Sequence, residues 1–114
     1  MGNHTLFLLK PGFYDGEDGP FFCPHNAAVE GLLKYEPSLI KKLDIRRVRF
    51  EKPRSEIVKL LGEENQFTPV LVIEESQEPP TDAQVSTSTG RAFVLGEIAI
   101  GNFLHQEFGT PKPH

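Results

Sequence analysis

The chain has 114 residues, of which 38% are hydrophobic and 25% charged, and this balance predicts a single small domain over residues 1–114. Its formal net charge of −4 argues against a nucleic-acid partner, because neutralising phosphates requires a basic surface. The longest apolar run, residues 6–9, is far shorter than the ~20 residues that span a bilayer, and the N-terminus lacks a secretion signal. Cys23 is the only cysteine, so we expect no disulfide and a cytoplasmic location.

The first third of the chain predicts a strand, a loop and a helix. Residues 5–9 (TLFLL) form an apolar run of strand length that ends in a Lys-Pro-Gly turn. Residues 10–22 mix glycine, proline, acidic and aromatic residues, which predicts a loop with unusual apolar content. From Pro24, which suits the first helical position, helix-spaced apolar residues continue to Pro37. Cys23 is therefore expected at a helix N-terminus.

A strand at the edge of the sheet and a short helix follow. Residues 38–43 predict one helical turn, and residues 45–50 (IRRVRF) interleave polar and apolar side chains as a partly exposed edge strand does. Ser55 is the predicted N-cap of a helix over residues 56–61, which Gly62 ends. We attribute the basic residues around this strand to protection of a free sheet edge, with anion binding as the alternative. They are Lys41, Lys42, Arg46, Arg47, Arg49, Lys52 and Arg54.

The second half predicts the centre of the sheet and a last helix. Residues 70–73 (VLVI) are typical of a central strand, with Pro69 at its start, where no ladder donor is needed. Residues 74–90 are polar and predict a long mobile loop. Residues 91–95 predict a fourth strand, and residues 97–108 an amphipathic helix. The order β-α-β-α-β-β-α predicts an α/β fold in which helices cover both faces of a mixed four-stranded sheet.

Two landmarks of the sequence resemble the thioredoxin-like superfamily. Cys-Pro-His-Asn at residues 23–26 follows the first strand and opens the first helix, and Thr68-Pro69 directly precedes the central strand. The resemblance implies a thioredoxin-like fold in which Cys23 is the reactive cysteine and Pro69 lies beside it. It also implies that the Thr68-Pro69 peptide is cis, an isomer found in only ~5% of X-Pro bonds.

Two further segments are most similar to the glutaredoxins and to the N-terminal domain of glutathione transferases. They are Pro69-Val70-Leu71 and residues 99–104 (AIGNFL), which match the Pro-Val-Leu and Ala-Ile-x-x-Tyr-Leu segments of those proteins. The chain also resembles a small bacterial family of stand-alone thioredoxin-like domains. It departs from the pattern at Asn26, where two-cysteine members carry their second thiol, and at Gly96 and Glu97, where the transferases bind the glutamyl end of glutathione.

Cys23 has the predicted placement of an activated thiol. A helix N-terminus stabilises a thiolate through unpaired N–H groups and the helix dipole, and a protonated His25 would add positive charge. A single thiol can form a mixed disulfide with glutathione, transfer a thioether, or become a sulfenic acid that an external thiol resolves. The alternatives are an inert, half-buried Cys23 and a merely solvated His25, and Asn26 is expected to face solvent or to bond the first helical turn.

The aromatic residues before the cysteine have two interpretations. Phe13, Tyr14, Phe21 and Phe22 are placed to form an apolar wall beside Cys23, or to fill the core. For Phe21 and Phe22, which directly precede the cysteine, we expect the core.

These observations predict a single-cysteine thiol-redox protein with Cys23 and His25 as candidate catalytic residues. Glutathione is the candidate co-substrate, and the residues predict no metal site. The backbone at Thr68 and Val70 would pair with a thiol-containing peptide, as a peptide adds to a strand edge. The full set of candidate binding residues is Pro24, Asn26, Thr68, Pro69, Val70 and Glu97. The alternative is a non-catalytic binding or adaptor module that uses loop 13–22 or loop 74–90, and a homodimer is compatible with either function.

Overall fold

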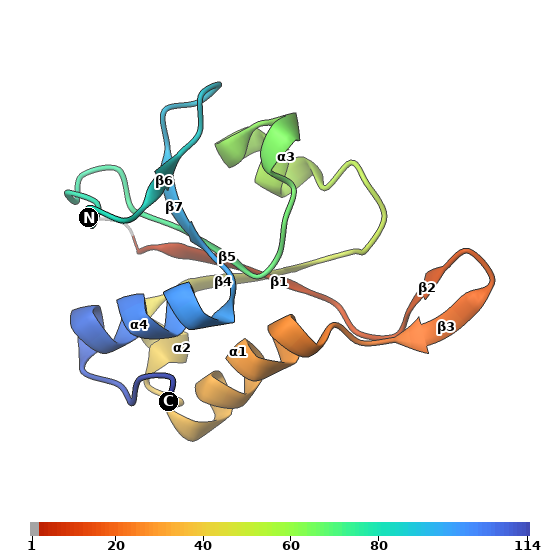
Figure 1. The fold of residues 1–114 in the computed structure, drawn as a ribbon, viewed down its shortest axis with the longest axis horizontal. Coiled ribbons are helices and arrows are strands. Elements are labelled where there is room, and N and C mark those ends of the chain that lie inside the picture. Colours follow the sequence, from red (N-terminus) through yellow and green to blue (C-terminus); the bar gives the residue numbers. More distant parts are fainter. Residues whose placement is uncertain (1–2) are drawn as a thin grey trace.

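A five-stranded mixed sheet organises the chain in the computed structural model, which describes residues 3–114 (Figure 1). The strands are β1 (Thr5–Leu9), β4 (Asp44–Val48), β5 (Val70–Val72), β6 (Gln84–Val85) and β7 (Ala92–Leu95). Their order across the sheet is β4-β1-β5-β7-β6, with β4 parallel to β1 and every other neighbour antiparallel. The α/β class and the mixed sheet are confirmed, and β4 lies at an edge as predicted.

Helices cover both faces of this sheet. They are α1 (Pro24–Tyr35), α2 (Leu39–Lys42), α3 (Ser55–Leu61) and α4 (Glu97–Phe108), with a 3₁₀ turn, η1 (Glu63–Asn65), after α3. Figure 1 shows α1 and α4 side by side on one face and α3 on the other. Among residues 3–114, no helix is long and apolar enough to cross a bilayer.

The alternation of β1 explains why the whole strand is apolar. Successive side chains of a strand point to opposite faces. Leu6 and Leu8 accordingly join the core under α1 and α4, whereas Phe7 and Leu9 join the core under α3. All five residues of β1 are buried because both faces of the strand are covered.

Two predicted loops contain strands. Residues 10–22 hold an antiparallel hairpin of β2 (Phe13–Asp15) and β3 (Asp18–Phe21), with Gly16 at φ 68° in the turn, where glycine is unstrained. Residues 74–90 contain β6, which pairs with β7 and makes the predicted count of four strands wrong. All three strands are short and mostly exposed, so none of them has the apolar alternation that identifies a half-buried strand.

The start of α3 also differs from the prediction. Ser55 is the first helical residue rather than the N-cap, which is Arg54. The backbone N–H of Arg54 donates to Oε1 of Gln66 (2.6 Å), and its guanidinium binds the carbonyl oxygens of Phe50 and Gln66. The helix start is therefore fixed by contacts with a neighbouring segment and not by a capping hydroxyl.

The central position of β5 yields a stability prediction. Leu71 is fully buried, so Leu71→Ala should lower the free energy of unfolding by about 2–5 kcal/mol through lost burial and the cavity left behind. The matched control is Ile98→Ala, because Ile98 is 57% exposed and its truncation should change stability by less than about 0.5 kcal/mol. Urea unfolding followed by circular dichroism measures both values, and equal losses in the two variants would contradict the assigned core.

Candidate thiol site

Cys23 lies at the junction of the β2–β3 hairpin and α1, where it is the N-cap residue of the helix. Its side chain is half-buried and lines a cavity of about 510 Å³. The other lining residues come from the end of β1, the hairpin, the segment after β4 and the segment before β5. They are Leu9, Phe13, Phe50, Glu51, Lys52, Arg54, Gln66, Phe67 and Thr68. The thiol therefore faces a hollow that is open to solvent, with largely apolar walls and a charged rim.

Asn26 fixes the first turn of α1 against the sheet. The side chain is 2% exposed, and its Oδ1 accepts a hydrogen bond from the backbone N–H of Leu9 (2.9 Å). Its Nδ2 donates to Oγ1 of Thr68 (3.2 Å). The expectation that Asn26 faces solvent is wrong, because its amide is buried and bonds Leu9 and Thr68. A buried amide must find such partners. The same side chain also lowers the pKa of Cys23 at the start of its own helix.

The segment before β5 supplies the other side of the site. The Thr68-Pro69 peptide is cis, as predicted, and Pro69 is buried with its carbonyl accepting a hydrogen bond from the N–H of Gly96 (3.0 Å). Thr68 lines the same cavity as Cys23. Val70 does not, because it lies inside the sheet, paired with Phe7 and Leu95 and 1% exposed. Of the two positions predicted to pair with a peptide, only Thr68 lines the cavity.

The environment of Cys23 favours the thiolate. Partial burial is the largest single influence and opposes ionisation. Hydrogen bonds from the Asn26 side chain and from the backbone of Asn26 and His25, together with the nearby charge of His25, outweigh it and lower the pKa of the thiol. The depression therefore comes mainly from donors in the first turn of α1, which is the contribution expected at a helix N-terminus.

His25 and Glu97 form an exposed ion pair between the starts of α1 and α4. His25 Nδ1 lies 2.7 Å from Oε2 of Glu97, and the His25 side chain is 68% exposed. The hydrogen bond to Glu97 raises the pKa of His25, and the same contact lowers the pKa of Glu97. Pro24, the first helical residue, is exposed and makes no comparable polar contact among the residues described. The Glu97 carboxylate is thus already occupied by a neighbour of the thiol.

The cavity wall includes residues that the sequence did not identify. Phe50 and Arg54 belong to the predicted edge strand and the segment after it, whereas Phe67 lies just before the central strand. Arg54 sits over the Phe50 ring at 5.7 Å, and burial lowers the pKa of its guanidinium while the proximity of Cys23 raises it. The only sequence signal for Arg54 was its place among the basic residues around the edge strand. That signal does not distinguish an arginine held by carbonyl oxygens from an arginine in solvent.

The aromatic residues of the hairpin divide between the cavity and solvent. Phe13 lines the cavity and stacks on Phe50, with ring centroids 4.4 Å apart and planes at 7°. Phe21 and Phe22 are 39% and 63% exposed, so their predicted place in the core is wrong. Phe21 ends β3 at the base of the hairpin, and Phe22 follows it immediately before Cys23.

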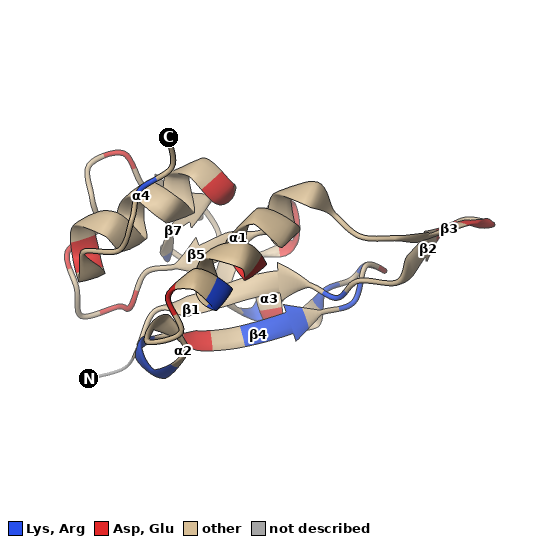
Figure 2. Cartoon of the chain, turned by 90° about the horizontal axis from the view of Figure 1, so that it is seen from below, with Lys and Arg blue, Asp and Glu red and all other residues tan. Residues whose placement is uncertain are grey.

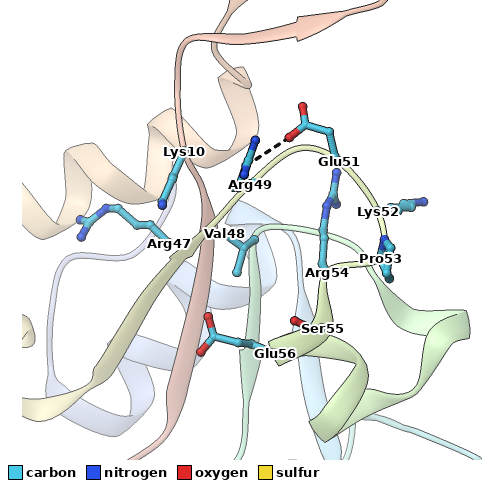
Figure 3. Close-up of a pocket in the computed structure, with 10 residues that line it drawn as sticks. All are labelled: Lys10, Arg47, Val48, Arg49, Glu51, Lys52, Pro53, Arg54, Ser55 and Glu56. Atoms are coloured by element: carbon cyan, nitrogen blue, oxygen red, sulfur yellow. Dashed lines mark ion pairs between the residues drawn. The ribbon is translucent and has the colours of Figure 1, made fainter.

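A second cavity of about 460 Å³ lies beside the first, across residues 49–54 (Figure 3). Its basic side chains include Lys10, Arg47, Arg49 and Lys52. In Figure 3 they point in different directions rather than toward a common centre. Arg47 is paired with Glu30 on α1 (2.7 Å). No cluster of three histidine, cysteine or carboxylate side chains able to hold a metal ion occurs within residues 3–114.

The comparison with known proteins identifies a family. The family model described as "Protein of unknown function (DUF3088)" matches residues 3–112. No curated protein and no solved structure matches the chain. Because the match covers nearly all of the 114 residues, the chain belongs to the DUF3088 family.

Proposed function

We propose that this chain is a thioredoxin-like, single-cysteine thiol protein that exchanges disulfides through Cys23. The observation that carries the proposal is the placement of its one thiol. Cys23 is the N-cap of a helix whose first turn lowers the pKa of the thiol, and its side chain opens into a cavity of about 510 Å³ that Thr68 also lines. A reducing cytoplasm is the compartment that would keep such a thiol free.

The strand arrangement supports a thioredoxin-like topology. β1 and β4 are parallel and joined through α1, while β5 and β7 are antiparallel to β1 and β5 respectively and lead into α4. The cysteine follows β1 directly in space, and the cis proline begins β5. The β2–β3 hairpin and the two-residue β6 are additions to that core pattern.

The proposed reaction is an exchange between a thiolate and a disulfide. The Cys23 thiolate attacks one sulfur of a bound disulfide R–S–S–R′, forming the mixed disulfide Cys23–S–S–R as the original S–S bond breaks. The departing R′–S⁻ takes a proton from solvent. The chain has no second cysteine, so an external thiol must attack the mixed disulfide and release Cys23. Glutathione is the candidate for that external thiol.

The polar groups around the cavity limit how glutathione would bind. The backbone of Thr68 is the position at which an extended peptide would pair, because Val70 is enclosed by both neighbouring strands. Glu97 is already paired with His25 through Oε2, so an amine would have to share this carboxylate with His25. Binding through Thr68 and the basic rim at Lys52 therefore fits the site better than binding through Glu97.

The reactivity of Cys23 is the first prediction of this proposal. The alkylation rate with iodoacetamide, followed by intact mass against pH, should have its midpoint below the ~8.5 of a free cysteine. Pretreatment with glutathione disulfide should form the mixed disulfide, raise the protein mass and block alkylation. Reduced glutathione, removed before alkylation, should release Cys23 and restore the reaction. Cys23→Ser should lose both alkylation and thiol transfer completely, and it serves as the control for reaction elsewhere.

An unreactive Cys23 would support the alternative function, a non-catalytic binding module. A midpoint at or above that of a free cysteine, with no mixed disulfide, would make Cys23 an inert residue of a binding or adaptor module. Thiol transfer that persists in Cys23→Ser would show that the activity belongs to another molecule in the preparation.

The His25–Glu97 pair generates a second prediction. Glu97→Gln removes the negative charge that holds the proton on His25, so the pKa of His25 should fall. At pH values between the original and the lowered pKa, His25 carries less positive charge in the variant than in the unaltered chain. The pKa of the Cys23 thiol should therefore rise. NMR titration of His25 and pH-dependent alkylation of Cys23 measure the two shifts.

The control for this variant is Glu78→Gln, which removes one exposed carboxylate of the 74–90 segment. It should leave both titrations unchanged. Because the pair is exposed, the effect of Glu97→Gln should shrink in 1 M salt, where charges are screened within about 3 Å. A Cys23 midpoint that does not respond to Glu97→Gln at low salt would remove His25 from the activation of the thiol.

A further inference from the structure

The β2–β3 hairpin is a fixed arm that projects from the body of the protein (Figures 1 and 2). Its base is held by a backbone hydrogen bond from the N–H of Gly12 to the carbonyl of Phe21 (2.7 Å). The stack of Phe13 on Phe50 joins the same base to the segment after β4. Beyond these contacts the strands pair only with each other. An arm with a rigid base and no intramolecular cover presents a surface for another molecule.

The tip of this arm is acidic. Asp15, Glu17 and Asp18 place three carboxylates within four residues, and all three side chains are exposed. None of them forms an ion pair with any part of the chain that the structure describes. Figure 2 shows these acidic residues at the far end of the molecule, away from its other charged segments. The tip therefore carries negative charge without an intramolecular partner.

The flanks of the arm add apolar surface next to this charge. Tyr14 and Phe22 are 54% and 63% exposed, and Phe21 is 39% exposed. Exposed aromatic side chains beside unpaired charge are typical of surfaces that become buried on association, where large rings supply contact area and the charges set the register.

The complementary surface lies at the base of the same arm. We call it the basic groove, in which Lys10, Arg49 and Lys52 line the second cavity with Glu51 and Glu56 (Figure 3). Arg47 also lines it but is already paired with Glu30. Lys10 and Lys52 form no ion pair with residues 3–114, and Arg49 is 80% exposed with a single contact of 3.4 Å to Glu51. Figure 2 shows this positive surface along the end of β4 and the segment that follows it. In a chain with a formal charge of −4, this is a local excess of positive charge.

The arm cannot bring its own tip to this groove. The groove begins at Lys10, immediately before the hairpin, and the strands carry the tip away from it by about 10 Å at ~3.4 Å per residue. Folding the tip back would break the hairpin pairing and the Phe13 stack. The acidic tip and the basic groove of one chain are therefore complementary surfaces that cannot meet within that chain.

We propose that two copies of the chain associate by reciprocal exchange of these surfaces, with the acidic tip of each arm in the basic groove of the other. A two-fold axis that crosses the arms midway places each tip at the base of its partner's arm, so both contacts form at once. The exposed rings of Tyr14, Phe21 and Phe22 then lie between the two arms. This proposal does not rest on the thiol chemistry, although Lys52 lines both cavities.

The test reverses charge on one surface at a time. Sedimentation equilibrium in 20 mM salt should show a dimer for the unaltered chain, and 0.5 M salt should weaken it. A tip variant, Glu17→Lys with Asp18→Lys, and a groove variant, Lys10→Glu with Arg49→Glu, should each weaken dimerisation about tenfold or more. The loss is large because each change acts at both symmetric contacts.

Mixing the two variants gives the decisive measurement. In a one-to-one mixture, the positive tip of the tip variant meets the negative groove of the groove variant. The unaltered negative tip of the groove variant meets the unaltered positive groove of the tip variant. The mixture should therefore regain a dimer. The control, Glu78→Lys with Asp82→Lys, has the same net charge as the tip variant but changes only the 74–90 segment, and it should dimerise like the unaltered chain.

Other outcomes overturn the proposal. An unaltered chain that remains monomeric at 0.5 mM in low salt would show that these surfaces do not bind one another. A tip or groove variant that dimerises as well as the unaltered chain would place any dimer contact elsewhere. Failure of the mixture to recover, with both variants folded by circular dichroism, would rule out reciprocal exchange.

Discussion

The buried amide of Asn26 is the contact on which the geometry of the thiol site depends. It joins three segments that the chain brings from distant positions: the end of β1 through the N–H of Leu9, the first turn of α1, and Thr68 before the cis proline. An unsatisfied amide at 2% exposure would cost about 1–3 kcal/mol, so both hydrogen bonds are required. Because Cys23 lies three residues before Asn26, the amide also sets the position of the sulfur relative to the cavity.

The same contact explains how the site favours a thiolate without a buried counter-charge. The groups that lower the pKa of Cys23 are mainly hydrogen-bond donors of the helix start, and the Asn26 side chain is one of them. The charged pair of His25 and Glu97 is more exposed than these donors, and water weakens its electrostatic effect on the thiol. Positioned dipoles act at contact distance and resist screening, so the thiol depends on the correct seating of α1 more than on ionic conditions.

The local sequence pattern was sufficient to predict the elements that fill the core. It was insufficient to predict the elements that surround the thiol site. β1, β5, α1 and α4 were predicted because their apolar spacing reflects burial along one continuous segment. The hairpin was missed because its short, exposed strands lack that spacing. The role of Asn26 was missed for a different reason, since its partners lie 17 and 42 residues away in sequence and no local rule connects them.

The site residues show the same division between local and non-local information. Cys23 and the cis Thr68-Pro69 peptide were found because each belongs to a short motif that resembles a known superfamily. The cavity that Cys23 and Thr68 line was not predicted, because its walls depend on where the segment after β4 crosses the end of β1. Phe50 and Arg54 reach the thiol only through that crossing, and the carbonyl oxygens of Phe50 and Gln66 hold the guanidinium there.

The hairpin links the thiol cavity to the outer surface of the protein. Phe13 is both the base of the arm and a wall of the cavity, and its stack on Phe50 connects the two. The chain enters the arm from β1 and leaves it at Cys23, so the arm lies between the strand and the helix that together position the sulfur. A ring pair at 4.4 Å has little freedom to shift without opening the cavity. The arm's orientation and the shape of the space in front of the thiol are therefore fixed by one contact.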